Sequence, residues 1–166
     1  MKVIVIAILM CIVKVHADSK LEYIDSDSLS VNNFLVNKAT ALEVKGILGS
    51  PNINTITAGD FDNPNIYLRY ENNKYFFQMG NELMNSFAIV NGFVLVGEHR
   101  VNFNMTYQNT ISVFKAYKLV YFRQPNSVMP GEILIKYGNI NSDTFLRVTF
   151  GIADFKVSEI DIWTDY

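Results

Sequence analysis

An alternation of apolar and polar residues is the feature that most restricts how this 166-residue chain can fold. In the segment "NIYLRY" (65–70) the apolar side chains fall on one side of an extended strand, and Tyr67 and Arg69 fall on the other. "ENN" (71–73) predicts a turn, and "KYFFQMG" (74–80) predicts the returning strand of a hairpin. The chain must therefore build a sheet with two chemically different faces.

Further strands are expected after this hairpin. Residues 86–103 predict one long strand, with Gly92 or Gly97 as the place for a bulge or bend. Alternating residues near the C-terminus, at 144–150 and in the final segment, predict two more strands.

A short helix precedes the hairpin. Thr40 and Glu43 form a capping-box pattern, Gly49 lies where a left-handed residue would end the helix, and Pro51 prevents its continuation. One buried stripe is expected from four apolar residues at helical spacing: Ala41, Val44, Ile47 and Leu48.

The same order of elements recurs at a constant offset of 67 residues, which places Asn37 on Asn104 and Val44 on Ile111. A second helix is expected from near Thr106 through Phe114, and residues 124–131 form the loop before a second hairpin. We therefore expect an α+β fold: two tandem helix-plus-antiparallel-hairpin units, at about 29–96 and 97–163, forming a sheet with short helices packed on one face.

The first 17 residues have the build of a secretory signal peptide. Lys2 supplies a positive charge, residues 3–13 form an apolar run too short to span a bilayer comfortably, and residues 15–17 (Val-His-Ala) offer a cleavage site. Cleavage after Ala17 would leave residues 18–166 as a single mature domain that is periplasmic or secreted. The alternative is a lipoprotein signal in which Cys11 is lipidated.

Removal of residues 1–17 takes away the only cysteine, so no disulfide is expected in the mature chain. The mature chain keeps 12 Lys and Arg against 16 Asp and Glu, a net charge of −4. This mild acidity argues against nucleic acid or an anionic membrane as the main partner, and no later apolar run predicts a membrane span. A monomer or weak dimer is expected.

The residues for common catalytic and metal sites are scarce. His99 is the one histidine after residue 17, no G-x-S-x-G motif occurs, and no His/Cys cluster predicts a metal site. Acids at Asp60, Asp62 and Glu71 resemble a calcium-loop spacing, but Asn65 stands where that loop needs glycine. Nothing in the spacing of the acids selects a catalytic pair. We therefore expect no enzyme activity, no cofactor and no metal.

The polar side of the expected sheet carries the residue types that are enriched at protein-binding hot spots. If the helices cover the aliphatic side, the other side becomes a candidate binding face. The competing interpretation is an ordinary solvated face with a few stabilising cross-strand pairs. The candidate partner-binding residues are Tyr67, Arg69, Lys136, Arg147, Glu159, Asp161 and Trp163.

The pattern "T-x-x-E-V-K-x-I-L-G-S-P" (40–51), followed by the apolar strand "I-Y-L-R-Y" (66–70), resembles the BamE (SmpA/OmlA) family of small outer-membrane assembly proteins. Two such units in tandem resemble the architecture of β-lactamase inhibitor proteins. The resemblance implies a sheet face that binds protein, and it transfers no individual functional residues.

Three function classes follow. The preferred one is a binder of inhibitor or immunity type that captures an enzyme or toxin through its sheet face. The alternative is an envelope assembly or structural factor of BamE type. An enzyme or small-ligand carrier would need a converging polar pocket, of which the sequence gives no sign.

Overall fold

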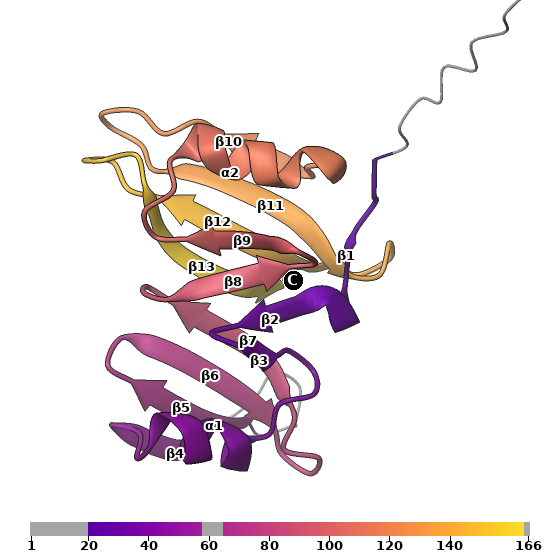
Figure 1. Ribbon diagram of the computed structural model, residues 1–166, viewed down its shortest axis with the longest axis vertical. Helices are drawn as coiled ribbons and strands as arrows, with labels where there is room; N and C mark the ends of the chain where they lie inside the picture. The colour runs from indigo at the N-terminus through magenta and orange to yellow at the C-terminus, as the bar shows by residue number, and fades with distance from the viewer. Residues whose placement is uncertain (1–19, 58–64, 165–166) are drawn as a thin grey trace, which may run out of the picture.

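The computed structural model describes residues 20–57 and 65–164 and is built mostly of β-strands (Figure 1). Two short α-helices accompany the strands, and the strands form two sheets. The strands are β1 (Ile24–Asp25), β2 (Leu29–Val31), β3 (Phe34–Leu35), β4 (Ile53–Thr57), β5 (Asn65–Tyr70), β6 (Asn73–Gln78), β7 (Met84–Ile89), β8 (Phe93–Val96), β9 (His99–Asn102), β10 (Tyr121–Arg123), β11 (Gly131–Gly138), β12 (Thr144–Phe150) and β13 (Val157–Thr164).

The larger sheet has nine strands in the order β1-β11-β12-β13-β7-β6-β5-β4, and β10 pairs with β11 beside β1. All its pairings are antiparallel except that of β1 with β11, so the sheet is mixed. The junction between its two halves is β13 against β7, with Asp161 opposite Ala88.

The smaller sheet has four strands in the order β3-β2-β8-β9. It corrects the expectation of one long strand at 86–103, because that segment contains β7, β8 and β9, and only β7 belongs to the larger sheet. The chain turns at Gly92 and Gly97, where the φ angles are +96° and +59°. Glycine adopts such positive φ values without strain. The two glycines therefore end one strand and start the next, where a bulge or bend within a single strand was expected.

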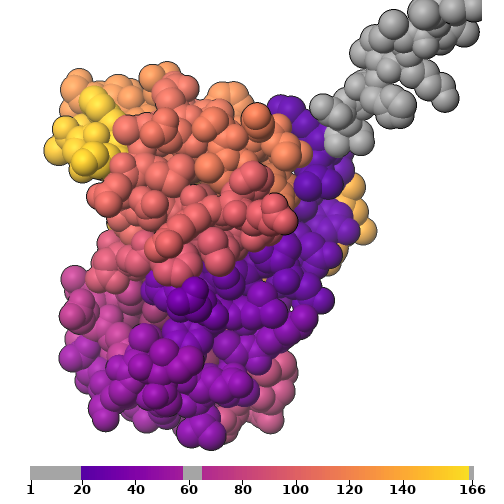
Figure 2. Space-filling view, viewed as in Figure 1, coloured from indigo at the N-terminus to yellow at the C-terminus, as the bar shows by residue number. Residues whose placement is uncertain are grey.

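The expected α+β fold of two tandem helix-plus-hairpin units is therefore wrong. The nine-stranded mixed sheet and the second sheet make the protein mostly β, and the N-terminal strands do not stay within one half. β1 pairs with β11, whereas β2 pairs with β8. In Figure 2 the N-terminal part of the chain runs alongside residues from its later half as one continuous surface.

Both expected helices are present. α1 (Ala41–Leu48) begins at Thr40 with a complete capping box, and α2 (Tyr107–Val113) begins at Thr106 and continues into a 3-10 turn, η2 (Phe114–Ala116). A shorter 3-10 turn, η1 (Ser26–Ser28), joins β1 to β2.

Of the four residues expected to form a buried stripe on α1, two are buried. Ala41 and Val44 are buried, but Ile47 is 73% exposed and Leu48 is 40% exposed. Gly49 has the expected positive φ of 81°, but its ψ of −153° lies outside the left-handed helical region. α1 therefore packs through its first half only.

One hydrophobic core lies between the larger sheet and the layer formed by the helices and the smaller sheet. The core includes Phe87 and Ile160 from the larger sheet, Val31 and Val94 from the smaller sheet, and Phe114 next to α2. Figure 1 shows α1, α2 and the smaller sheet on the same side of the larger sheet. The alternating burial along β11 fits this arrangement, since every second side chain enters the core.

The predicted signal peptide at 1–17 and its alternative at Cys11 lie outside the described residues, as do Asp60 and Asp62. Glu71 lies in the turn after β5, and β5 itself begins at Asn65, so the segment 65–70 is strand as expected. None of the helices within 20–57 and 65–164 has the length and apolarity needed to cross a bilayer.

Candidate binding face

The face of the larger sheet that points away from the core is called here the open face. In the register of the sheet, one row of side chains crosses this face from strand to strand. That row consists of Tyr121, Leu134, Arg147, Asp161, Ala88, Lys74, Arg69 and Ile53.

All seven candidate residues from the sequence lie on the open face, in two groups. Tyr67 and Arg69 lie on β5, at one end of the sheet. The other five lie on β11, β12 and β13, in the other half of the sheet: Lys136, Arg147, Glu159, Asp161 and Trp163. The strands β6 and β7 separate the two groups.

The group on β11, β12 and β13 centres on an ion pair. Arg147 donates from Nε to Asp161 Oδ1 over 2.9 Å and from Nη2 to Asp161 Oδ2 over 2.6 Å. This bidentate geometry gives the strongest hydrogen bonding between a guanidinium and a carboxylate. The pair is largely shielded from solvent, since the Asp161 side chain is only 10% exposed and that of Arg147 28%. The hydrogen bond to Asp161 raises the pKa of the Arg147 guanidinium, so Arg147 is a permanent cation.

Aromatic rings surround this ion pair. The Phe145 and Trp163 rings lie 5.7 Å apart between centroids, and the Arg147 guanidinium lies 5.7 Å from the centroid of Trp163. Lys136 lies 6.0 Å from the Phe145 ring, while its ammonium group donates to the carbonyl oxygen of Ile140 over 2.8 Å. Phe145 is buried, yet it lies outside the hydrophobic core. We call these residues the C-terminal cluster: Lys136, Phe145, Arg147, Asp161 and Trp163.

The group that begins with Tyr67 and Arg69 on β5 also includes Lys74 and Phe76 on β6. We call these four residues the N-terminal cluster. The Tyr67 and Phe76 rings are stacked, with centroids 5.2 Å apart and an interplanar angle of 24°. Arg69 and Lys74 stand directly opposite each other on β5 and β6. Among the described residues no acidic group lies within ion-pair distance of either cation.

The two clusters therefore differ in electrostatics. In the C-terminal cluster Asp161 neutralises Arg147, whereas like charges directly opposite on neighbouring strands destabilise the N-terminal cluster. The Nε atom of Arg69 is also buried without a hydrogen-bond partner among the described residues. Between the clusters β7 contributes only the small side chains of Ser86 and Ala88 to the open face.

Three members of these clusters were not predicted from the sequence: Lys74, Phe76 and Phe145. Lys74 and Phe76 alternate with the buried residues Tyr75 and Phe77, so the same period of two could have placed them on the open face. Phe145 was harder to find, because it precedes the buried Leu146 and is itself buried.

The open face offers hydrogen-bonding and aromatic surfaces. His99 begins β9, is exposed, and belongs to the smaller sheet, as expected for a solvated strand-end histidine. Within 20–57 and 65–164, no three His, Cys, Asp or Glu side chains are grouped so that they could hold a metal ion.

No family model and no curated protein matches the chain. Among solved structures, the chain is similar to the crystal structure of a DUF4309 family protein (YjgB) from Bacillus subtilis subsp. subtilis str. 168. The two share 14% sequence identity with a TM-score of 0.42, over 78% of this chain and 81% of that chain.

Proposed function

We propose that this protein is a non-enzymatic binding module, of inhibitor or immunity type, that captures a folded enzyme or toxin through its open face. The C-terminal cluster is the observation that carries the proposal. Arg, Trp and other aromatic residues dominate binding hot spots, and here Arg147 and Trp163 are already held in place by Asp161 and Phe145. Side chains that are ordered before binding lose little conformational entropy when they bind.

The dimensions of the open face support this proposal. Seven spacings separate the eight strands from β10 to β4, and at about 4.8 Å each they make the face roughly 34 Å wide. A standard protein interface covers about 800 Å² on each partner. A face of this width can accommodate one.

The charges indicate which kind of surface would fit. Arg69 and Lys74 are cations without an acidic partner among the described residues, so an acidic group of the partner would relieve their mutual repulsion. We therefore propose a partner that places a carboxylate-rich edge over the N-terminal cluster and an apolar or aromatic patch over Trp163.

The proposal includes secretion or export to the periplasm, with residues 1–17 removed. Terminal sequencing of the protein from its native host tests this part. A chain that starts at Asp18 supports it, and a chain that starts at a lipidated Cys11 supports the envelope assembly role of BamE type.

A pull-down from the envelope and secreted fractions of the source organism tests the binding role. The bait is the chain 18–166, compared with Trp163→Ala and Arg147→Ala variants, and a Lys115→Ala variant on η2 serves as the control. We expect one soluble enzyme or toxin that co-elutes in a one-to-one complex, is retained by the control, and is lost with either face variant. Recovery of outer-membrane assembly components would favour the assembly role, and equal recovery by all four baits would contradict binding through the open face.

A further inference from the structure

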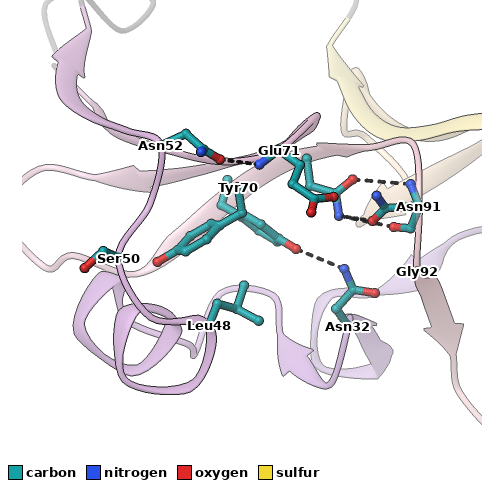
Figure 3. A pocket seen from close by; sticks show the side chains of 10 residues that line it. Asn32, Leu48, Ser50, Asn52, Tyr70, Glu71, Asn91 and Gly92 are labelled. Carbon is teal, nitrogen blue, oxygen red and sulfur yellow. Dashed lines mark hydrogen bonds between the residues drawn. The ribbon is translucent and has the colours of Figure 1, made fainter.

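A pocket with both polar and apolar lining lies on the opposite side of the larger sheet from the open face. Its volume is about 450 Å³, and it lies where the segment after α1 meets the β2–β3, β5–β6 and β7–β8 turns (Figure 3). Tyr70 and Tyr75 line it, whereas their neighbours Arg69 and Lys74 point to the open face. The pocket is therefore separate from the proposed protein-binding surface, within the size range of pockets for small molecules.

Two asparagine side chains hold the pocket in shape. Asn32 donates from Nδ2 to the Tyr75 hydroxyl over 2.9 Å and accepts from the Phe93 amide over 2.9 Å. Asn73 donates from Nδ2 to Asn91 Oδ1 over 2.6 Å and accepts from the Val90 amide over 3.0 Å. The Nδ2 and Oδ1 atoms of both asparagines already take part in hydrogen bonds within the protein. These two side chains therefore form the wall of the pocket and have few hydrogen bonds left to offer a ligand.

Other polar groups in the pocket remain able to form hydrogen bonds with a ligand. Asn52 uses its Oδ1 to accept from the Glu71 amide, and Asn91 uses its Oδ1 to accept from Asn73, so the Nδ2 donors of both remain available (Figure 3). The Ser50 hydroxyl and the Glu71 carboxylate make no side-chain hydrogen bond to another described residue. Donors and acceptors thus line the pocket from different sides, with Ser50 and Asn91 at opposite ends in Figure 3.

Aromatic side chains supply the rest of the wall. The Tyr70 and Tyr75 rings meet edge to face, with centroids 6.1 Å apart, and the Tyr70 hydroxyl donates to the Gly49 carbonyl oxygen over 2.9 Å. This hydrogen bond connects β5 to the end of α1. Tyr75 itself is buried, so the partly exposed Tyr70 and Leu48 offer the apolar surface to the C–H groups of a ligand.

We propose that this pocket binds a neutral saccharide unit. Each sugar hydroxyl both donates and accepts, which matches a lining that offers the amide donors of Asn52 and Asn91, the Ser50 hydroxyl and the Glu71 carboxylate. Among the described residues no lysine, arginine or histidine lines the pocket, and Glu71 would repel an anion, so a phosphate or a carboxylate-bearing ligand is disfavoured. The polar rim around the tyrosines equally disfavours a purely apolar ligand.

Saturation-transfer NMR on the chain 18–166 tests this proposal with three probes: maltose, cellobiose and N,N′-diacetylchitobiose. We expect at least one of them to bind with a dissociation constant of roughly millimolar order, a weak affinity for so open a site. Asn52→Ala and Asn91→Ala should each weaken binding about tenfold, the loss of one hydrogen bond. Asn54→Ala is the matched control, because Asn54 is an exposed asparagine on β4 that does not line the pocket.

Two results would overturn the proposal. The first is the absence of saturation transfer from all three sugars at concentrations well above millimolar. The second is a loss of binding with Asn54→Ala that equals the loss with Asn52→Ala and Asn91→Ala. Circular dichroism of each variant confirms that it folds, and a Trp163→Ala variant should bind the sugar as the wild type does.

Discussion

At the scale of single residues, the Arg147–Asp161 pair has the clearest consequence for stability. Asp161→Asn removes the carboxylate charge that pairs with the Arg147 guanidinium, and the Arg147 side chain is only 28% exposed. Since Arg147 keeps some contact with water, we expect a loss of about 1–2 kcal/mol in the free energy of unfolding, less than for a fully buried pair. Urea denaturation measures this loss.

The exposed pair of Lys38 and Asp27 is the control for that prediction. Its nitrogen and oxygen lie 3.0 Å apart, but the two side chains are 54% and 66% exposed. Asp27→Asn should therefore change stability by less than about 0.5 kcal/mol. An equal effect of the two substitutions would contradict the view that the Arg147–Asp161 pair fixes the C-terminal cluster.

Gly92 is required by the turn that sends the chain from one sheet to the other. Its φ is +96°, and an added Cβ would overlap the Asn32 side-chain amide. We expect Gly92→Ala to cost about 2 kcal/mol or more, because strain and overlap act together. Thermal or urea denaturation provides the measurement.

Gly97 offers a comparison in the next turn, since its φ is +59° but an added Cβ would meet nothing within 4 Å. Gly97→Ala should cost only about 1 kcal/mol, the strain of the backbone alone. If Gly92→Ala were no worse than Gly97→Ala, the side-chain amide of Asn32 would not be fixed as described.

At the scale of elements, the capping box of α1 makes stability depend on pH. The Thr40 amide donates to Glu43 Oε2 over 2.8 Å, and this hydrogen bond lowers the pKa of Glu43 below its usual range. A carboxyl group with a lowered pKa in the folded state stabilises the protein above its unfolded pKa. This stabilisation is lost as the pH falls through the folded pKa.

Thr40→Ala removes the N-cap and should cost about 1 kcal/mol near neutral pH. The difference between variant and wild type should shrink in acid, where Glu43 is protonated in both. Thr55→Ala, at an exposed position on β4, is the control and should show no such pH dependence. A difference that stays constant from neutral to acidic pH would contradict the role of Glu43.

The hairpin of β5 and β6 carries a prediction that links stability to binding. Lys74→Glu replaces the repulsion between Arg69 and Lys74 with attraction, and it should stabilise the fold by about 0.5 kcal/mol. The same change should weaken capture of an acidic partner. Lys20→Glu, at an exposed residue outside the sheet, controls for net charge, and a destabilised Lys74→Glu variant would contradict the described register.

Elements with strong local signals could be predicted from the sequence. The capping box at Thr40, the alternation in 65–70 and the Thr106 cap all correspond to observed elements. Short strands such as β2 and β4 were not predicted, because three to five residues give too little periodicity and β4 is mostly exposed. Their pairing depends on residues distant in the sequence.

At the scale of the whole molecule, the division into two sheets was the main feature that the sequence did not predict. Local alternation shows which side chains share a face of a strand, but it does not show which sheet the strand joins. In the segment 86–103 the turn at Gly92 leads from the larger to the smaller sheet, and the turn at Gly97 stays within the smaller sheet. The side of each candidate residue could be predicted from the period of two. The separation into two clusters could not, since it depends on the pairing of β13 with β7.

The proposed function requires above all that the open face contacts a protein partner. Site-specific photo-crosslinking in the source organism tests it directly, with a photoreactive phenylalanine analogue placed at Phe76 or Thr149 on the open face. The control position is Lys115, an exposed residue on η2. We expect one discrete crosslinked protein from both face positions and none from Lys115. No crosslinked product from the face positions, or the same products from all three, would contradict the claim.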